Sequence, residues 1–304
     1  MALSRQTIKT IAMPLAMVVG AVLCRPLAQL EAASANMLTP LLIASMLFLT
    51  FCRIDLRQMR LKWLHLAMLA VLIVGGVVVF VAVKPLLGVV VAQGAMMCVL
   101  APIAMAAVVI GGMLGANVVT MVSYSLVCNI VTAVVVPPIL HAFGNGTCTF
   151  VEIISRVAPT LIAPFVVAQA LRYTLPRLAK WFADHSSYSF YIWLFSLVLV
   201  MGRTTAFIID TDAELITEIE LAAISLVLCL VQFTAGRILG KYLGDTVAGG
   251  QSVGQKNTIL AVWMSLNFLN PIASIAPTAY IVWQNFVNSF QIYRHEQRIA
   301  KEKR

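Results

Sequence analysis

The amino-acid sequence predicts an all-α membrane protein with ten transmembrane helices. Of its 304 residues, 61% are hydrophobic and 11% are charged, and the mean hydropathy is +0.94. Soluble domains are roughly half apolar. Apolar runs of about 18 or more residues recur along nearly the whole chain, and a bilayer requires each of them to close its backbone hydrogen bonds as a helix. We therefore expect a single integral membrane domain over residues 1–304.

The ten helices follow from hydropathy and from the positions of Gly and Pro. The predicted spans are residues 8–26, 37–51, 63–83, 87–107, 117–140, 151–172, 187–208, 219–240, 254–269 and 272–293. The first also fits a cleaved signal peptide, because Arg5 and Lys9 precede an apolar core and small residues follow near Ala33. The even number of spans favours a retained helix.

The charged residues of the predicted loops indicate how the helices are oriented. Most Lys and Arg lie in loops 52–62, 172–186 and 237–250 and in the C-terminal tail, whereas loop 209–220 is acidic. Basic loops are cytoplasmic by the positive-inside rule, which places both termini in the cytoplasm of a multi-pass protein of the cell (inner) membrane. The net charge of +9 is then a topology signal and not a nucleic-acid-binding surface, because the basic residues occupy short, separate loops.

Ten spans divide into two halves of five, and an odd number per half inserts the second half upside down relative to the first. This plan of inverted repeats, here about 1–145 and 146–304, is typical of secondary transporters, whose binding site lies at interrupted helices in matching positions. The fourth span is broken by Pro102, and the ninth opens with Gly249, Gly250 and Gly254 and ends at Asn270-Pro271. The fourth and ninth spans correspond under a five-plus-five division.

Three stretches carry a resemblance to a known family. Residues 252–290, SVGQKNTILAVWMSLNFLNPIASIAPTAYIVWQNFVNSF, resemble the last two helices of the bile acid:sodium symporter family. The positions that match its pattern are Val253, Gly254, Asn257, Pro271, Pro277, Trp283 and Asn285. Residues 115–140 and 41–60 are similar to the fifth helix of that family and to its second helix with the following basic loop.

The resemblance implies a panel subdomain and a core subdomain, with the interrupted fourth and ninth helices crossing in the core. It also implies transport of organic anions, such as bile acids, steroid conjugates or small carboxylates, driven by sodium ions bound at the crossing. This sequence departs from the family at the sodium ligands. Ser252 stands where the family has Glu and Lys256 where it has Gln, while Ala107 and Val108 replace a Ser-Asn pair. We therefore expect a sodium-independent carrier.

Lys256 is the residue on which this interpretation depends. Its ammonium group can replace a bound cation, with carbonyl oxygens of the broken helices and the side chains of Ser125, Asn117 and Asn257 as partners. Burial also disfavours a charged amine, so coupling to protons is an alternative. A third reading is a lysine that extends to the cytoplasmic interface. The complete set of predicted substrate- or ion-binding residues is Lys256, Asn257, Ser252, Gln255, Asn117, Ser125, Thr258 and Asn285.

The sequence favours binding and transport over catalysis. It contains no HExxH, GxSxG or Gly-rich phosphate motif, and its six cysteines show no CxxC spacing, so we expect no enzyme activity, metal or cofactor. The expected partners are a small organic anion, the lipid bilayer and, in the coupled alternative, protons. Two rival functions remain: a membrane receptor on the same scaffold, and an arsenite-type carrier with Cys98 as its reactive thiol.

Overall fold

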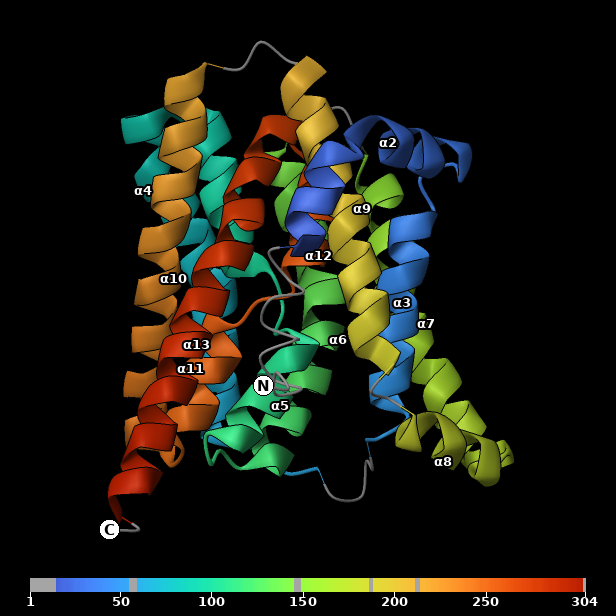
Figure 1. Ribbon diagram of the computed structural model, residues 1–304, viewed down its shortest axis with the longest axis vertical. Helices are drawn as coiled ribbons and strands as arrows, with labels where there is room; N and C mark the ends of the chain where they lie inside the picture. Colours follow the sequence, from blue (N-terminus) through green and yellow to red (C-terminus); the bar gives the residue numbers. More distant parts are fainter. Residues whose placement is uncertain (1–14, 55–58, 145–148, 186–187, 211–213, 303–304) are drawn as a thin grey trace, which may run out of the picture.

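The computed structural model describes residues 15–54, 59–144, 149–185, 188–210 and 214–302, and the regular secondary structure of these residues is helical (Figure 1). The helices are α2 (Cys24–Ala33), α3 (Leu38–Phe51), α4 (Trp63–Leu100), α5 (Met105–Met113), α6 (Val118–Phe143), α7 (Phe150–Thr174), α8 (Pro176–Asp184), α9 (Ser189–Asp210), α10 (Leu215–Leu243), α11 (Thr246–Gly254), α12 (Thr258–Phe268) and α13 (Ile275–Glu302), with a short 3-10 helix, η3 (Pro271–Ser274). Five of these helices, α4, α6, α7, α9 and α10, are long and apolar enough to cross a membrane. The predicted all-α membrane class is therefore confirmed, and the division into ten spans stays a prediction.

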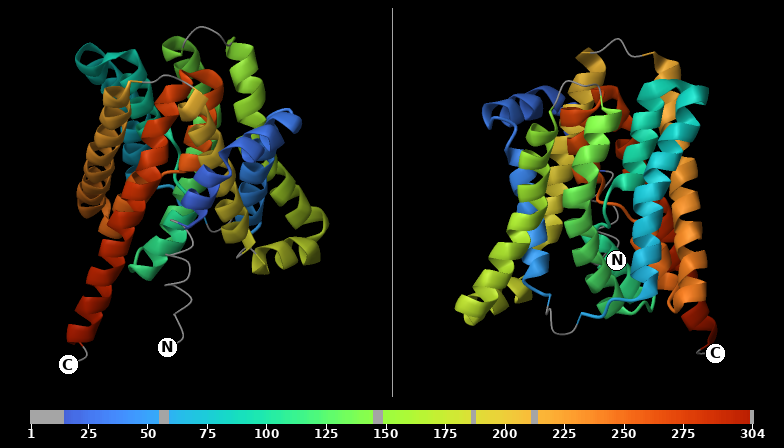
Figure 2. Two further views of the ribbon diagram at one scale, coloured as in Figure 1. Left: turned by 45° about the horizontal axis from the view of Figure 1, so that its top comes forward. Right: turned by 180° about the vertical axis from the view of Figure 1, so that it is seen from behind.

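Helix α4 contains two of the predicted spans. A kink at Gly88, whose φ of 83° is readily adopted by glycine, separates residues 63–87 from residues 89–100. The two segments pack against each other, since an added Cβ on Gly75 would lie 3.5 Å from the Val99 side chain and Gly76 contacts Leu100. The cyan and teal ribbons of Figure 2 show the chain folding back at this kink. The breakers between residues 83 and 87 were thus correctly interpreted as a boundary.

The first predicted span differs from the structure. Residues 8–14 lie outside the described part of the chain, and the helix that follows, Leu15–Val22, meets α2 at an angle of 79°. The span therefore ends at Val22 instead of continuing to residue 26. The buried carboxylate of Glu31 holds α2 in this bent position, because it accepts hydrogen bonds from the Thr39 backbone N–H at 3.3 Å and from Arg203 at 3.2 Å.

The helices pack in two groups that are seen side by side in Figure 1. One group contains α2, α3, α7 and α9, and the other contains α4, α10, α11 and α13. Basic α8 and the C-terminal end of α13 lie at one end of the molecule, and the last turn of α9 and the first turn of α10, which carry Asp210 and Glu218, lie at the opposite end (Figures 1 and 2). The basic and acidic ends are thus separated along the molecule, and the orientation in a membrane stays a prediction.

Small residues allow α10 and α11 to approach closely. The backbone of Gly236 in α10 lies against the carbonyl group of Gly249 in α11, and Gly240 contacts the backbone of Asp245 in the same way. Glycine faces of this kind are typical of packed membrane helices, where backbone contact replaces the hydrophobic driving force that operates in water. The contact places the C-terminal end of α11 deep in the group that contains α4.

Candidate functional site

Two helix interruptions meet in the middle of the molecule. Residues 101–104 separate α4 from α5, and residues 255–257 separate α11 from α12. The interruptions form an antiparallel bridge between Ile103 and Lys256. In this bridge Ala104 N–H donates to the Gln255 carbonyl at 2.9 Å and Asn257 N–H donates to the Pro102 carbonyl at 2.7 Å. Backbone groups freed by each break are therefore satisfied by the other break, as burial requires.

The ninth predicted span needs a correction at this point. The predicted span is residues 254–269, but the chain is already helical from Thr246, and the break falls at residues 255–257. The glycine-rich residues at the opening of the predicted span form α11, where Gly249 and Gly254 pack closely against α10. Lys256 therefore lies inside the interruption, between α11 and α12.

Lys256 is buried at the crossing, with 2% of its surface exposed. Its Nζ donates a hydrogen bond to the carbonyl oxygen of Val99 at 2.8 Å, and its backbone N–H donates to Oε1 of Gln284 at 2.9 Å. Val99 lies in the last turn of α4, where unpaired carbonyl groups and the helix dipole favour a positive charge. The alternative of a lysine that reaches the cytoplasmic interface is therefore wrong.

Two residues that sequence reasoning missed complete the polar contacts of the crossing. The Tyr280 hydroxyl donates to the Gly254 carbonyl at 2.8 Å, at the end of α11. Gln232 Nε2 donates to the Cys98 carbonyl and to the Tyr280 hydroxyl, both at 3.2 Å. The available signal was that Gln232 is polar within an apolar span. These contacts satisfy terminal carbonyl groups of both half-helices.

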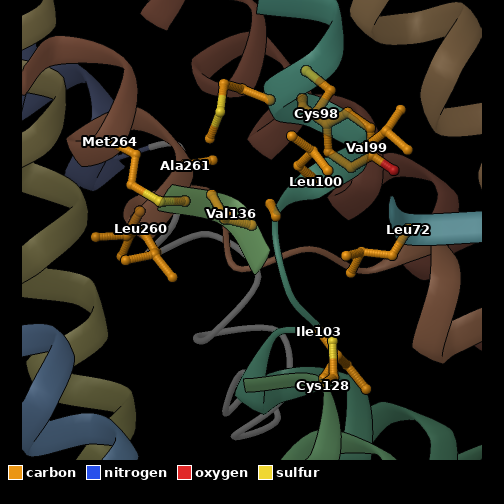
Figure 3. Packing of buried hydrophobic residues seen from close by; sticks show 14 of the residues in the cluster. Leu72, Cys98, Val99, Leu100, Ile103, Cys128, Val136, Leu260, Ala261 and Met264 are labelled. Carbon is orange, nitrogen blue, oxygen red and sulfur yellow. The ribbon is translucent and has the colours of Figure 1, made fainter. Parts of the chain in front are cut away.

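Several buried oxygen atoms near the crossing have no hydrogen-bond partner among the described residues. They include Oγ of Ser252, Oε1 of Gln255 and Oγ of Ser125. Ser125 belongs to the part of α6 that packs on the crossing, where Cys128 lies beside Ile103 (Figure 3). An unsatisfied buried polar atom costs about 1–3 kcal/mol, so each of these atoms favours a bound water molecule, ion or ligand beside it.

Of the other predicted site residues, Asn257 and Thr258 lie at the crossing, whereas Asn285 and Asn117 make contacts of their own. Asn257 caps α12 by accepting from Leu260 N–H at 3.3 Å, and Thr258 is buried in the first turn of that helix, so both lie at the crossing. Asn285 bonds within its own helix, to the Ile281 carbonyl at 2.7 Å. Asn117 lies elsewhere.

Asn117 begins α6, where its side chain accepts from Thr120 N–H at 3.0 Å. It is roughly 16 Å along the helix from Cys128, at 1.5 Å per residue. Its backbone N–H donates to Asp245, the residue that caps α11. The predicted contact between Asn117 and the Lys256 ammonium is therefore wrong. An N-cap must stay at the helix end, whereas the ammonium lies near the middle of α6.

Cys98, the residue considered for an arsenite-type carrier, is 1% exposed in the last turns of α4. Among the described residues, no group of three His, Cys, Asp or Glu side chains is arranged to hold a metal ion.

The chain matches no family model and no curated protein sequence at a significant level. Any function must therefore be argued from the structure, which is a helical membrane protein in which two broken helices cross around a buried lysine.

Proposed function

We propose that the protein is a sodium-independent secondary transporter of organic anions, in which the Lys256 ammonium group takes the place of a bound metal cation. The observation that carries the proposal is the buried Nζ of Lys256, held at 2.8 Å from a carbonyl oxygen at the crossing of two interrupted helices. Broken helices buried in a membrane protein are the usual location of substrate and coupling-ion sites in secondary transporters.

The charges at the crossing favour an anionic substrate. The ammonium group has three donors, and one of them is used by Val99. Helix α5 begins beside the bridge without a side-chain cap, so its first N–H groups and its positive dipole end face the interruption. A carboxylate or sulfonate bound between this helix end and Lys256 would be stabilised by both.

The arrangement of helices supports an alternating-access carrier. If the two segments of α4 are counted separately, and if its second segment is joined to α5 and α11 to α12, the helices can be assigned to five spans before residue 145 and five after it. The interrupted segments are then the fourth and the ninth. The group of α2, α3, α7 and α9 corresponds to a panel, and the remaining helices correspond to a core that moves against it.

Counterflow in proteoliposomes tests the proposal. Thermal-shift screening with taurocholate, a steroid sulfate and pyruvate first identifies a ligand, and the exchange of that labelled ligand is then followed in sodium and in choline buffers. We expect equal exchange rates in the two buffers, because the fixed amine replaces the exchangeable metal ion. Saturable stimulation by sodium would contradict the proposal, and binding without exchange would indicate a receptor.

Restoring the two residues of the symporter pattern gives a second prediction. The double variant Ser252→Glu with Lys256→Gln restores the carboxylate and amide of the symporter pattern. We expect its thermal midpoint to rise with sodium but not with potassium, since an ion that binds the folded state stabilises it. Lys256→Gln alone, which lacks the carboxylate, should show no sodium response. An unresponsive double variant would mean that the crossing is not a cation site.

A further inference from the structure

A second feature lies at the opposite end of α4 from the crossing. A crevice of about 260 Å³ is located between the start of α4 and α6, and Leu66, Leu69 and Val127 form its apolar wall. Lys62 and Trp63 border it. Trp63 is 78% exposed and Leu66 is 56% exposed, so the crevice faces the surroundings of the helix bundle, which in a membrane are lipid.

The lysine at this crevice is held in position. Lys62 is the N-cap of α4, and its backbone N–H donates to Nδ1 of His65 at 3.2 Å. Its Nζ donates to the Thr120 hydroxyl at 2.8 Å, which leaves two of its three donors for a ligand. In the part of the chain that the structure describes, the ion pairs are Arg25–Asp210 and Arg203–Glu31. No described carboxylate therefore neutralises Lys62.

A fixed positive charge beside an apolar crevice matches an amphipathic anion. Basic pockets between transmembrane helices at the cytoplasmic side bind anionic lipid head groups, and tryptophan side chains are enriched at that depth. We propose that this crevice binds one anionic phospholipid of the cytoplasmic leaflet, with its phosphate at Lys62 and an acyl chain along Leu66, Leu69 and Val127. The proposal goes beyond transport, because it requires only that the chain lies in a bilayer in the predicted orientation.

Lipid retention tests this site directly. The full-length protein is exchanged into bilayers that contain phosphatidylcholine and phosphatidylglycerol in equal amounts, and the lipids that stay bound are identified by native mass spectrometry. Wild type is expected to retain phosphatidylglycerol in preference to phosphatidylcholine. Lys62→Gln should lower this preference about fivefold, which is the contribution of one lysine near an anionic surface.

Two further variants make the outcome decisive. Lys84→Gln removes an exposed lysine at the other end of the same α4 segment, 5.8 Å from the Phe80 ring centroid, and should leave the preference unchanged. Val127→Phe fills the crevice and should reduce retention of both lipids. The proposal is overturned if Lys62→Gln keeps the wild-type preference or if Lys84→Gln loses it equally. Displacement of the lipid by glycerol phosphate alone would identify a site for soluble anions and would also overturn it.

Discussion

Lys256→Met is expected to abolish exchange of organic anions while leaving the thermal midpoint unchanged or raised. Methionine keeps much of the shape of the lysine side chain but removes its charge and its donors. The Val99 carbonyl then loses its partner, which costs about 1–3 kcal/mol. Burying an ammonium group without a carboxylate costs several kcal/mol, so removal of the charge offsets the lost hydrogen bond. Anion exchange is therefore lost while the thermal midpoint does not fall.

Measuring anion exchange and the thermal midpoint of Lys256→Met separately distinguishes a functional role of Lys256 from a structural one. Proteoliposome counterflow measures the first quantity, and fluorescence-detected thermal unfolding measures the second. Lys84→Met, on an exposed position of α4, is the matched control and should preserve both. A Lys256→Met protein that exchanges anions at the wild-type rate would refute the role of the amine. A protein that loses stability and exchange together would make Lys256 a structural residue.

Gly249→Ala is expected to destabilise the protein by about 1–3 kcal/mol, which is the usual cost of inserting a group into a filled interface. An added Cβ would collide with the backbone carbonyl oxygen of Gly236 in α10. A backbone group cannot change rotamer to relieve the contact, so α11 must shift as a whole. Because α11 ends two residues before Lys256, the shift also reaches the bridge with Ile103, and anion exchange should fall with stability.

The control for this change is Gly75→Ala in α4. Its added Cβ would lie 3.5 Å from the Val99 side chain, which is ordinary van der Waals contact. Alanine in a helix interior is favoured over glycine by about 0.5–1 kcal/mol, so the thermal midpoint of Gly75→Ala should equal or exceed that of wild type. If both variants unfold at the same temperature, the close approach of α10 and α11 is not a constraint on the fold.

The helices could be predicted from sequence because their signals are local. Hydropathy separated the segments that became α6, α7, α9 and α10 to within a few residues, and the breakers placed the kink of α4 and the interruption at Pro102. Charge in short loops predicted which ends of the helices lie together. Each of these properties depends on residues within a few turns of one another along the chain.

The candidate site was predicted only in part. The pattern around Lys256 identified a residue that the structure places at the crossing, and Asn257 and Thr258 lie there with it. Asn117 was included because it is polar within an apolar region, although its short side chain serves as an N-cap. Gln232 and Tyr280 were missed because polar and aromatic residues in membrane helices are most often packing contacts, and nothing local distinguishes the two cases.

By itself, the sequence determined that the chain is a helical membrane protein, that one helix is interrupted at Pro102, and that a lysine follows a glycine-rich break before another apolar helix. Only the tertiary structure decided that residues 101–104 meet residues 255–257. It also decided that the Lys256 amine points to the end of α4 and not to the membrane interface. A glycine contact with α10 brings α11 to this crossing. Helix periodicity reports which residues share a face within one segment. The partner of a broken backbone lies about 150 residues away in sequence, and it is chosen by the requirement that every buried N–H and C=O group find a hydrogen bond.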